Sequence, residues 1–335
     1  MSAPRGHTNL LQIFFLKKLL VPSEQAYSII VNCWCTSLPA KSIKMKKILL
    51  ISAAAFITAA LLSYTLKTPV SMQPTADCTI SCYNGEIRDQ IQSDATKPGF
   101  AALHPQPLKF KLVNPLGVAL TFKAADGTNA KGYFIKASKK SNKWLFVIQE
   151  WWGLNDYIKR ESDNYYKELG DINVLALDMY DGKVASSPDS AMLYMRTASA
   201  TRLENIVKGA ITYAGTNAKI YTIGWCFGGG WSLQATILAG KQAAGCVMYY
   251  GKPETNMNRL KMINCDVIGF FGNKDQNFTP EVVNTFEKDM KEAGKNISVN
   301  RYEAGHGFAN PSNPSFDKEA TADAHAKAIA FLKAH

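Results

Sequence analysis

YTIGWCFGGG, residues 221–230, decides how this chain folds. An apolar run ends at Gly224, and Cys226 follows two residues later with a glycine at Gly228. This Gly-x-Cys-x-Gly spacing is typical of a sharp strand-to-helix turn that presents a nucleophile, with cysteine where serine is commoner. The glycines leave room for strand and helix to approach, and the helix N-terminus favours the thiolate form of Cys226. The alternative is a glycine-rich strand–helix connection that contains a buried cysteine.

Short apolar runs alternate with helical patterns on both sides of this turn. Runs typical of strands buried on both faces occupy residues 144–148, 172–177, 219–223, 244–250 and 265–271, with a further strand at 297–302. Helices are predicted over residues 155–169, 189–214, 227–240, 280–293 and 316–334. Residues 116–137 alternate in polarity around a turn and predict a hairpin. We therefore predict an α/β fold with a mostly parallel central sheet, helices on both faces and an N-terminal β-hairpin.

Two further residues lie where predicted strands end. Asp275 follows the run at 265–271, and His306 follows the strand at 297–302. Parallel sheets place their chemistry in loops at the carboxyl ends of strands, so we expect both side chains to meet Cys226. The order nucleophile, acid, histidine is that of α/β-hydrolases. In that arrangement His306 holds or takes the thiol proton, and Asp275 fixes the tautomer of the imidazole.

The segment QEWWG, residues 149–153, ends another apolar strand. Carboxylates are disfavoured there unless they are paired or functional, so Glu150 is a fourth candidate; the alternative is a carboxylate at a helix start or on the surface. Amides of this segment, together with the Phe227 N–H, are candidates for an oxyanion hole. Aromatic residues next to these positions indicate either a substrate pocket or core packing: Trp151, Trp152, Trp225 and Phe308.

The other histidines and cysteines are weaker candidates. His104 falls in a polar spacer, and His325 and His335 fall within or at the end of the last helix. Cys246 and Cys265 lie inside apolar runs and are predicted to be buried core residues. Because no Cys-x-x-Cys pair or His-x-x-x-His spacing occurs, the sequence predicts no metal site.

The first hundred residues follow a different pattern. Residues 45–62 begin with a basic Met-Lys-Lys and continue with a run of 15 apolar residues, shorter than the about 20 that span a bilayer. This is typical of a secretory signal, so we expect export to the periplasm or the medium, or anchoring through residues 45–62 if the leader is not cleaved. In an exported chain Cys78 and Cys82 form a disulfide or remain free thiols. The predicted organisation is a mis-annotated, disordered extension (1–44), a leader or anchor (45–76), a spacer (77–107) and a catalytic domain (108–335).

The charge of the chain is concentrated near its start. The formal net charge is +11, of which residues 1–76 contribute +7 and the remainder +4. An unclustered excess of this size gives no case for nucleic-acid binding. We therefore expect a small-molecule substrate and a monomeric protein, with membrane contact only through an uncleaved N-terminal segment.

These separated motifs resemble the dienelactone hydrolases (carboxymethylenebutenolidases), a family of the α/β-hydrolase superfamily. The resemblance covers roughly residues 108–335, and its pieces are QEWWGLNDYIKR, LALDMYDG, IGWCFGGG, YYGKPE, GNKDQNFTPE and AGHGFANP. It implies cleavage of an enol lactone through an acyl-cysteine that water then hydrolyses, with no metal or organic cofactor.

The resemblance also implies roles for individual residues. It makes Cys226 the nucleophile, Asp275 the acid and His306 the base. It assigns Glu150 to a carboxylate that contacts the resting thiol and helps to deliver the thiolate. Its oxyanion donors correspond to two backbone N–H groups, those of Trp151 and Phe227.

One position departs from the family pattern. In the family, an arginine four residues after the catalytic histidine binds the substrate carboxylate. In this sequence that position is Asn310, and Arg196 aligns poorly as a replacement. Losing a bidentate guanidinium costs about 1.5–3 kcal/mol of binding, which puts dienelactone itself in doubt as the substrate. The predicted function is hydrolysis of a lactone or carboxylic ester. Its alternatives are a general carboxylesterase or thioesterase with the same triad, a thiol redox protein, and a non-catalytic membrane-tethered binding protein on this fold.

Overall fold

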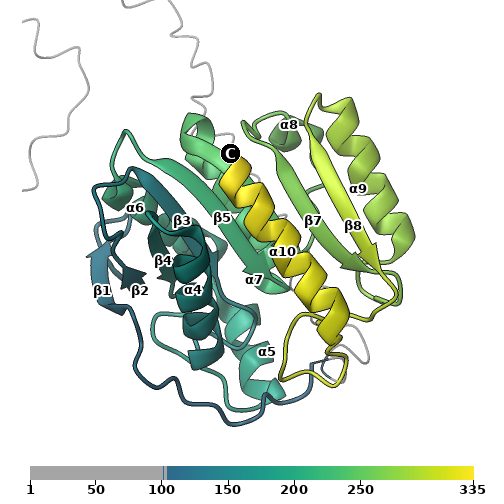
Figure 1. The fold of residues 1–335 in the computed structure, drawn as a ribbon, viewed down its shortest axis with the longest axis horizontal. Helices are drawn as coiled ribbons and strands as arrows, with labels where there is room; N and C mark the ends of the chain where they lie inside the picture. The colour runs from purple at the N-terminus through teal and green to yellow at the C-terminus, as the bar shows by residue number, and fades with distance from the viewer. Residues whose placement is uncertain (1–100, 102–103) are drawn as a thin grey trace, which may run out of the picture. The chain divides into compact units, whose positions relative to one another are not determined.

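The computed structural model describes residue 101 and residues 104–335. The predictions for the extension, the leader and the Cys78–Cys82 pair lie outside these residues. In the described part, eight strands form one sheet in the order β1-β2-β4-β3-β5-β6-β7-β8 (Figure 1). The strands are β1 (Val118–Lys123), β2 (Asn129–Ile135), β3 (Lys143–Ile148), β4 (Asn173–Leu177), β5 (Lys219–Trp225), β6 (Ala243–Tyr249), β7 (Val267–Gly272) and β8 (Ile297–Tyr302).

The direction of the strands agrees with the predicted fold class. β1 and β2 form an antiparallel hairpin, and β2 also runs antiparallel to β4. The pairs from β4 through β3, β5, β6 and β7 to β8 are all parallel. The hairpin therefore extends one edge of a parallel sheet, which confirms the predicted mostly parallel architecture with an N-terminal hairpin.

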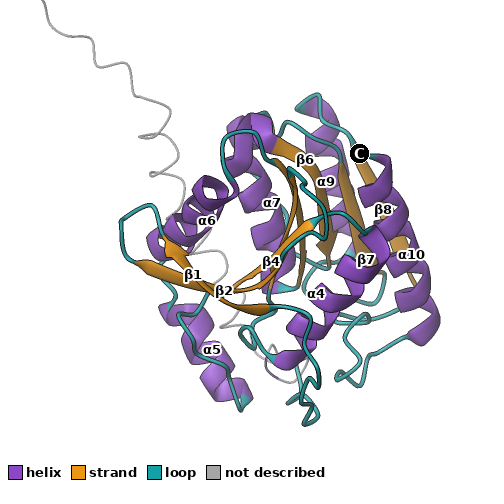
Figure 2. Ribbon diagram, turned by 60° about the vertical axis from the view of Figure 1, so that its left-hand side comes forward, coloured by secondary structure: helices purple, strands orange, loops and turns teal. Residues whose placement is uncertain are grey.

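Helices follow most of the parallel strands (Figure 2). They are α4 (Asp156–Leu169), α5 (Pro188–Thr197), α6 (Ala200–Ala214), α7 (Phe227–Ala239), α8 (Met257–Leu260), α9 (Pro280–Glu292) and α10 (Lys318–Ala334), with a 3₁₀ turn at Gly240–Gln242. Within the described residues, no helix has the length and apolar character needed to cross a membrane.

One predicted helix was wrong. The sequence predicted a continuous helix over 189–214, but the structure divides it into α5 and α6. Ala198 takes an extended conformation, with φ −63° and ψ 113°, and its N–H still donates to the carbonyl of Tyr194 at the end of α5. No glycine or proline marks this break, so its local sequence resembles a helix interior. The short α8 was also missed.

The sheet is buried on both faces because successive residues of its central strands enter different clusters. Phe146 and Ile148 of β3 pack with side chains of α6 and α7 on one face. Leu145 and Val147 pack on the other face, with side chains of α4 and α10. Figure 1 shows α4 and α10 in front of the sheet, where the two helices contact each other. The alternation follows from the two-residue period of a strand.

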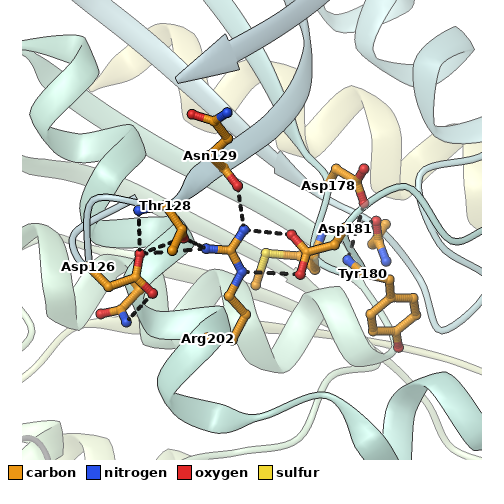
Figure 3. Close-up of polar contacts among 10 residues, drawn as sticks. Asp126, Thr128, Asn129, Asp178, Tyr180, Asp181 and Arg202 are labelled. Carbon is orange, nitrogen blue, oxygen red and sulfur yellow. Dashed lines mark hydrogen bonds and ion pairs between the residues drawn. The ribbon is translucent and has the colours of Figure 1, made fainter. Parts of the chain in front are cut away.

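Arg202 on α6 ties the hairpin to the loop after β4 (Figure 3). Its Nε and Nη2 donate to the two carboxylate oxygens of Asp181, at 3.1 and 2.6 Å. Nη1 donates to Thr128 Oγ1 at 2.6 Å, and Nη2 donates to the carbonyl of Asn129 at 2.7 Å. One guanidinium therefore holds the hairpin turn against the body of the sheet.

Candidate active site

Cys226 sits at the turn between β5 and α7, in a backbone conformation that side chains rarely adopt. Its φ is 54° and its ψ is −115°. Its N–H donates to the carbonyl of Tyr249 at 3.0 Å, which fixes this strained turn to β6. A Cβ on Gly224 would lie 2.1 Å from the carbonyl oxygen of Gly228, and a Cβ on Gly228 would lie 2.2 Å from that of Ile148. Both positions therefore require glycine, because a side chain at either one would clash with the neighbouring backbone.

Cys226, His306 and Asp275 form one hydrogen-bonded row. The Nε2 atom of His306 lies 3.3 Å from the sulfur of Cys226, and its Nδ1 lies 2.7 Å from Oδ2 of Asp275. All three side chains are buried. Cys226 follows β5, Asp275 follows β7 and His306 follows β8. The carboxyl ends of three parallel strands therefore bring the residues together, as expected for a parallel sheet.

The charges of this row stabilise each other. Burial by itself would lower the pKa of His306, but the carboxylate of Asp275 and the charged sulfur of Cys226 outweigh it and hold this pKa well above its usual value. Burial would raise the pKa of Asp275, yet the charge of His306 and its hydrogen bond leave the pKa below the usual range. The N–H groups of Asn277 and Phe278 donate to the other Asp275 oxygen, at 2.7 and 3.1 Å. The row therefore favours a protonated His306 beside an ionised Asp275.

Glu150, in the loop after β3, is the fourth predicted residue. Tyr250 donates its hydroxyl to Oε1 at 3.4 Å, and Asn310 donates its amide to Oε2 at 2.7 Å. Burial raises the pKa of Glu150 to about 7, although the positive charge of His306 and these two hydrogen bonds act in the opposite direction. The carboxylate can therefore gain or lose a proton near neutral pH, which suits a group that exchanges protons in a site.

His104 lies against Cys226, so its assignment to a spacer outside the site was wrong. Spacer composition made it a poor candidate, but its Nε2 lies 3.5 Å from the sulfur of Cys226 and only 5% of the residue is exposed. Its ring centroid lies 4.6 Å from that of Trp151 and 4.9 Å from that of His306. The segment before the catalytic domain therefore contributes a side chain to the site. His325 pairs with Glu168 and lines the cavity that reaches Glu150, and His335 pairs with Asp266.

The remaining predicted residues divide between a cavity and the core. Trp225 and Asn310 line a cavity that reaches Glu150 and extends past Tyr165 and Arg160. The other aromatic candidates belong to the buried clusters of the two sheet faces, and they are Trp151, Trp152 and Phe308. Phe227 is the first residue of α7, where helix N–H groups have no partner within the helix, and Trp151 lies in the turn after β3.

Other residues depart from expectation or were missed. Tyr250 was not a candidate, although it follows β6 and the strand-end rule could have selected it. Cys246 is fully buried as predicted, but Cys265 is only partly buried. Arg196 is exposed near the end of α5.

Comparisons with known proteins agree on one family. A sequence model of the dienelactone hydrolase family matches residues 131–335. Carboxymethylenebutenolidase 1 of Cupriavidus pinatubonensis is 27% identical over 231 residues, which cover 64% of this chain and 95% of the relative. A carboxymethylenebutenolidase from a Pseudomonas species is 31% identical over 136 residues, which cover 38% of this chain and 54% of that relative.

A solved structure extends the likeness to the fold. The dienelactone hydrolase of Anabaena variabilis has a TM-score of 0.50 at 16% identity, over 67% of this chain and 99% of its own. Because the family model covers most of the chain and the strand order supports the same architecture, this protein belongs to the dienelactone hydrolase family, a family of hydrolases with the α/β-hydrolase fold.

Proposed function

We propose that this protein hydrolyses a small lactone or carboxylic ester through an acyl-cysteine intermediate. The observation that carries the proposal is the row of Cys226, His306 and Asp275, with its 3.3 and 2.7 Å contacts. Nucleophile, base and orienting acid stand in the order and at the separations of a nucleophilic triad. The strained turn supports the same role, because a nucleophile elbow holds its nucleophile in a strained backbone conformation such as the one at Cys226.

The first half of the reaction forms a thioester. The sulfur of Cys226 attacks the substrate carbonyl carbon, and its proton resides on His306 Nε2. The carbonyl oxygen becomes an oxyanion, and its proposed donors are the backbone N–H groups of Phe227 and Trp151. The tetrahedral intermediate collapses, the bond from carbon to the leaving oxygen breaks, and His306 donates its proton to that oxygen. For a lactone the new hydroxyl stays attached to the acyl group.

The second half releases the acid. A water molecule gives a proton to the neutral His306 and attacks the thioester carbonyl. The carbon–sulfur bond then breaks, and the thiolate of Cys226 is restored beside the imidazolium. Asp275 keeps the Nδ1–H of His306 directed at its carboxylate throughout, so that Nε2 always faces the reacting atoms.

Glu150 supports the entry into this cycle. With a pKa of about 7 it exists in both protonation states near neutral pH, so it can exchange a proton with the site while the thiol proton of Cys226 resides on His306. Tyr250 and Asn310 hold its two oxygens separately and prevent the carboxylate from rotating freely. Glu150 thus adds a second proton-exchanging group near His306.

The same contacts narrow the class of substrate. Where family members carry an arginine for the substrate carboxylate, Asn310 is engaged by Glu150 at 2.7 Å. A substrate anion at this position would face a buried carboxylate, with no guanidinium from residue 310 to offset the repulsion. Uncharged lactones and esters are therefore preferred over dienelactone-like acids.

The test is a panel of neutral lactones, carboxylated lactones, alkyl esters and thioesters assayed on wild type, Cys226→Ala and Cys226→Ser. We expect wild type to cleave neutral members best, Cys226→Ala to be inactive, and quenched wild type to carry the acyl mass on the peptide that contains Cys226. Cys265→Ala is the matched control, since burial raises the pKa of Cys265 and keeps that thiol protonated. Full hydrolysis by Cys226→Ala would overturn the proposal. Faster turnover of thioesters than of oxygen esters would instead favour the thioesterase alternative.

A further inference from the structure

His104 gives this active site a third potential metal ligand. It lies outside the residues matched by the family model, which begins at residue 131. It is nevertheless buried, and it approaches the sulfur of Cys226 as closely as a hydrogen-bonding partner does. The mechanism above uses His306 alone and gives His104 no part, so this side chain needs its own explanation.

The geometry of the three side chains suits one small cation. One donor atom each from His104, Cys226 and His306 lie within 4.8 Å of one another. The two sulfur-to-nitrogen separations are 3.3 and 3.5 Å. A tetrahedral zinc site, with zinc–sulfur bonds of about 2.3 Å and zinc–nitrogen bonds of about 2.0–2.1 Å, has sulfur–nitrogen edges of about 3.5 Å. The two sulfur–nitrogen separations therefore suit such a cation, whereas the two ring nitrogens, which lie within 4.8 Å of each other, would have to approach to about 3.3 Å when it binds.

The chemistry of the donors selects the kind of cation. One thiolate and two imidazoles form a soft ligand set that prefers zinc over magnesium or calcium. His306 also has the outer partner that metal-binding histidines usually possess, because Asp275 contacts its other ring nitrogen at 2.7 Å. This contact directs Nε2 towards the sulfur, which is the orientation that a metal ligand needs.

We propose that His104, Cys226 and His306 form a reversible site for a thiophilic divalent cation such as Zn²⁺, and that occupation of this site blocks hydrolysis. Binding forms one sulfur–metal bond and two nitrogen–metal bonds, and it releases the thiol proton to solvent. The nucleophile and its base are then both occupied. The inhibitory effect rests on the proposed function, whereas the binding of the cation does not.

The sequence predicted no metal site because it contains no Cys-x-x-Cys or His-x-x-x-His pair, the short spacings that are typical of metal sites. Here the three ligands lie far apart along the chain: His104 is 122 residues before Cys226, and His306 is 80 residues after it. Only the fold places the donors together.

Cobalt binding tests the site without any assay of hydrolysis. Co²⁺ titrated into the whole chain should produce visible bands of a tetrahedral site and a thiolate-to-cobalt charge-transfer band. Cys226→Ser should lose the charge-transfer band, and His104→Ala should weaken binding by at least about tenfold, the lower limit seen when even an outer partner of a metal ligand is removed. His335→Ala, which removes a partly exposed histidine at the end of α10, should match wild type.

Inhibition by zinc tests the second part of the proposal, that occupation of the site blocks hydrolysis. Each variant is compared with its own metal-free rate, so that a change in basal activity does not affect the result. Zinc should inhibit wild type and His335→Ala at the same concentration, a chelator should reverse the inhibition, and His104→Ala should require at least about tenfold more zinc. Equal cobalt and zinc affinity in His104→Ala and wild type would refute the site. A cobalt spectrum without detectable hydrolysis of any ester would refute the proposed function and leave the metal site standing.

Discussion

Asn310 donates a 2.7 Å hydrogen bond to Oε2 of Glu150, across 160 residues of sequence. Its own carbonyl oxygen accepts from the backbone N–H of Ser312 at 2.9 Å and from the Ser312 hydroxyl at 2.7 Å, so the orientation of the amide is fixed. A residue expected only to line the substrate pocket thus fixes the carboxylate of Glu150. Asn310 therefore contributes directly to the environment of Glu150.

Replacing Glu150 with glutamine should change how stability depends on pH. Burial raises the pKa of Glu150 to about 7 from the ordinary 4.5, so the native state binds this proton more tightly than the unfolded chain does. The resulting stabilisation is complete below about pH 4.5 and is lost as pH rises to about 7. Glu150→Gln resembles the protonated acid, so its free energy of unfolding should exceed that of wild type by on the order of 3 kcal/mol at pH 8 and match it near pH 4.

Urea denaturation of both proteins at intervals between pH 4 and pH 8 measures this difference. Glu161→Gln, which removes a less buried carboxylate next to Arg160, is the control for the loss of one negative charge. A gap that stays constant across the range would show that the pKa of Glu150 is the same in the native and unfolded states, and a gap that closes as pH rises would show that this pKa is lowered in the native state.

Replacing Asp275 with asparagine should abolish most of the activity while preserving the fold. An amide donates to Nδ1 instead of accepting from it, so the imidazole takes the wrong tautomer and its pKa falls when the neighbouring charge is removed. We expect kcat to fall by about 10³–10⁴-fold on the best substrate of the panel, with an unchanged circular dichroism spectrum. Asp266→Asn, which alters the exposed partner of His335, is the matched control. A loss below tenfold would remove Asp275 from the triad.

Replacing Arg202 with lysine should loosen the hairpin. One ammonium cannot reproduce the paired contacts with Asp181 together with those to Thr128 and Asn129. Because the side chain is partly exposed, we expect a loss of about 1 kcal/mol and a decrease of about 2–4 °C in Tm. Calorimetry of Arg202→Lys, Asp181→Asn and the double variant checks the pairing. Effects that simply add would mean that the two side chains do not stabilise each other.

The leader is expected to direct export. Protein expressed from Met45 in a bacterial host should appear in the periplasm or the medium, because residues 45–62 combine a basic start with a short apolar run. A variant with Lys46→Glu and Lys47→Glu should be retained, since the positive start is lost. Fractionation with an antibody against a C-terminal tag gives the location, and mass spectrometry shows whether the leader is cleaved. Recovery of the full-length chain in the cytosol would contradict the signal.

The sequence by itself determined the fold class and the row of Cys226, His306 and Asp275. Each depended on local patterns, namely the period of buried strands and the glycine spacing around a tight turn. The meeting of Asp275 and His306 with Cys226 could also be predicted, because parallel strands bring their carboxyl ends to one edge of the sheet. The division of residues 189–214 into two helices was not predicted, because the break between the helices contains only residues that a helix interior tolerates.

Only the tertiary structure decided what surrounds that row. The contact of His104 with Cys226, the hydroxyl of Tyr250 at Glu150 and the amide of Asn310 at Glu150 join segments separated by 100 residues or more. No local period records such contacts, because they arise when loops and a preceding segment pack over the ends of the strands. The turn that carries Cys226 was visible in ten residues of sequence, whereas the contacts that His104, Tyr250 and Asn310 make around the site exist only after folding.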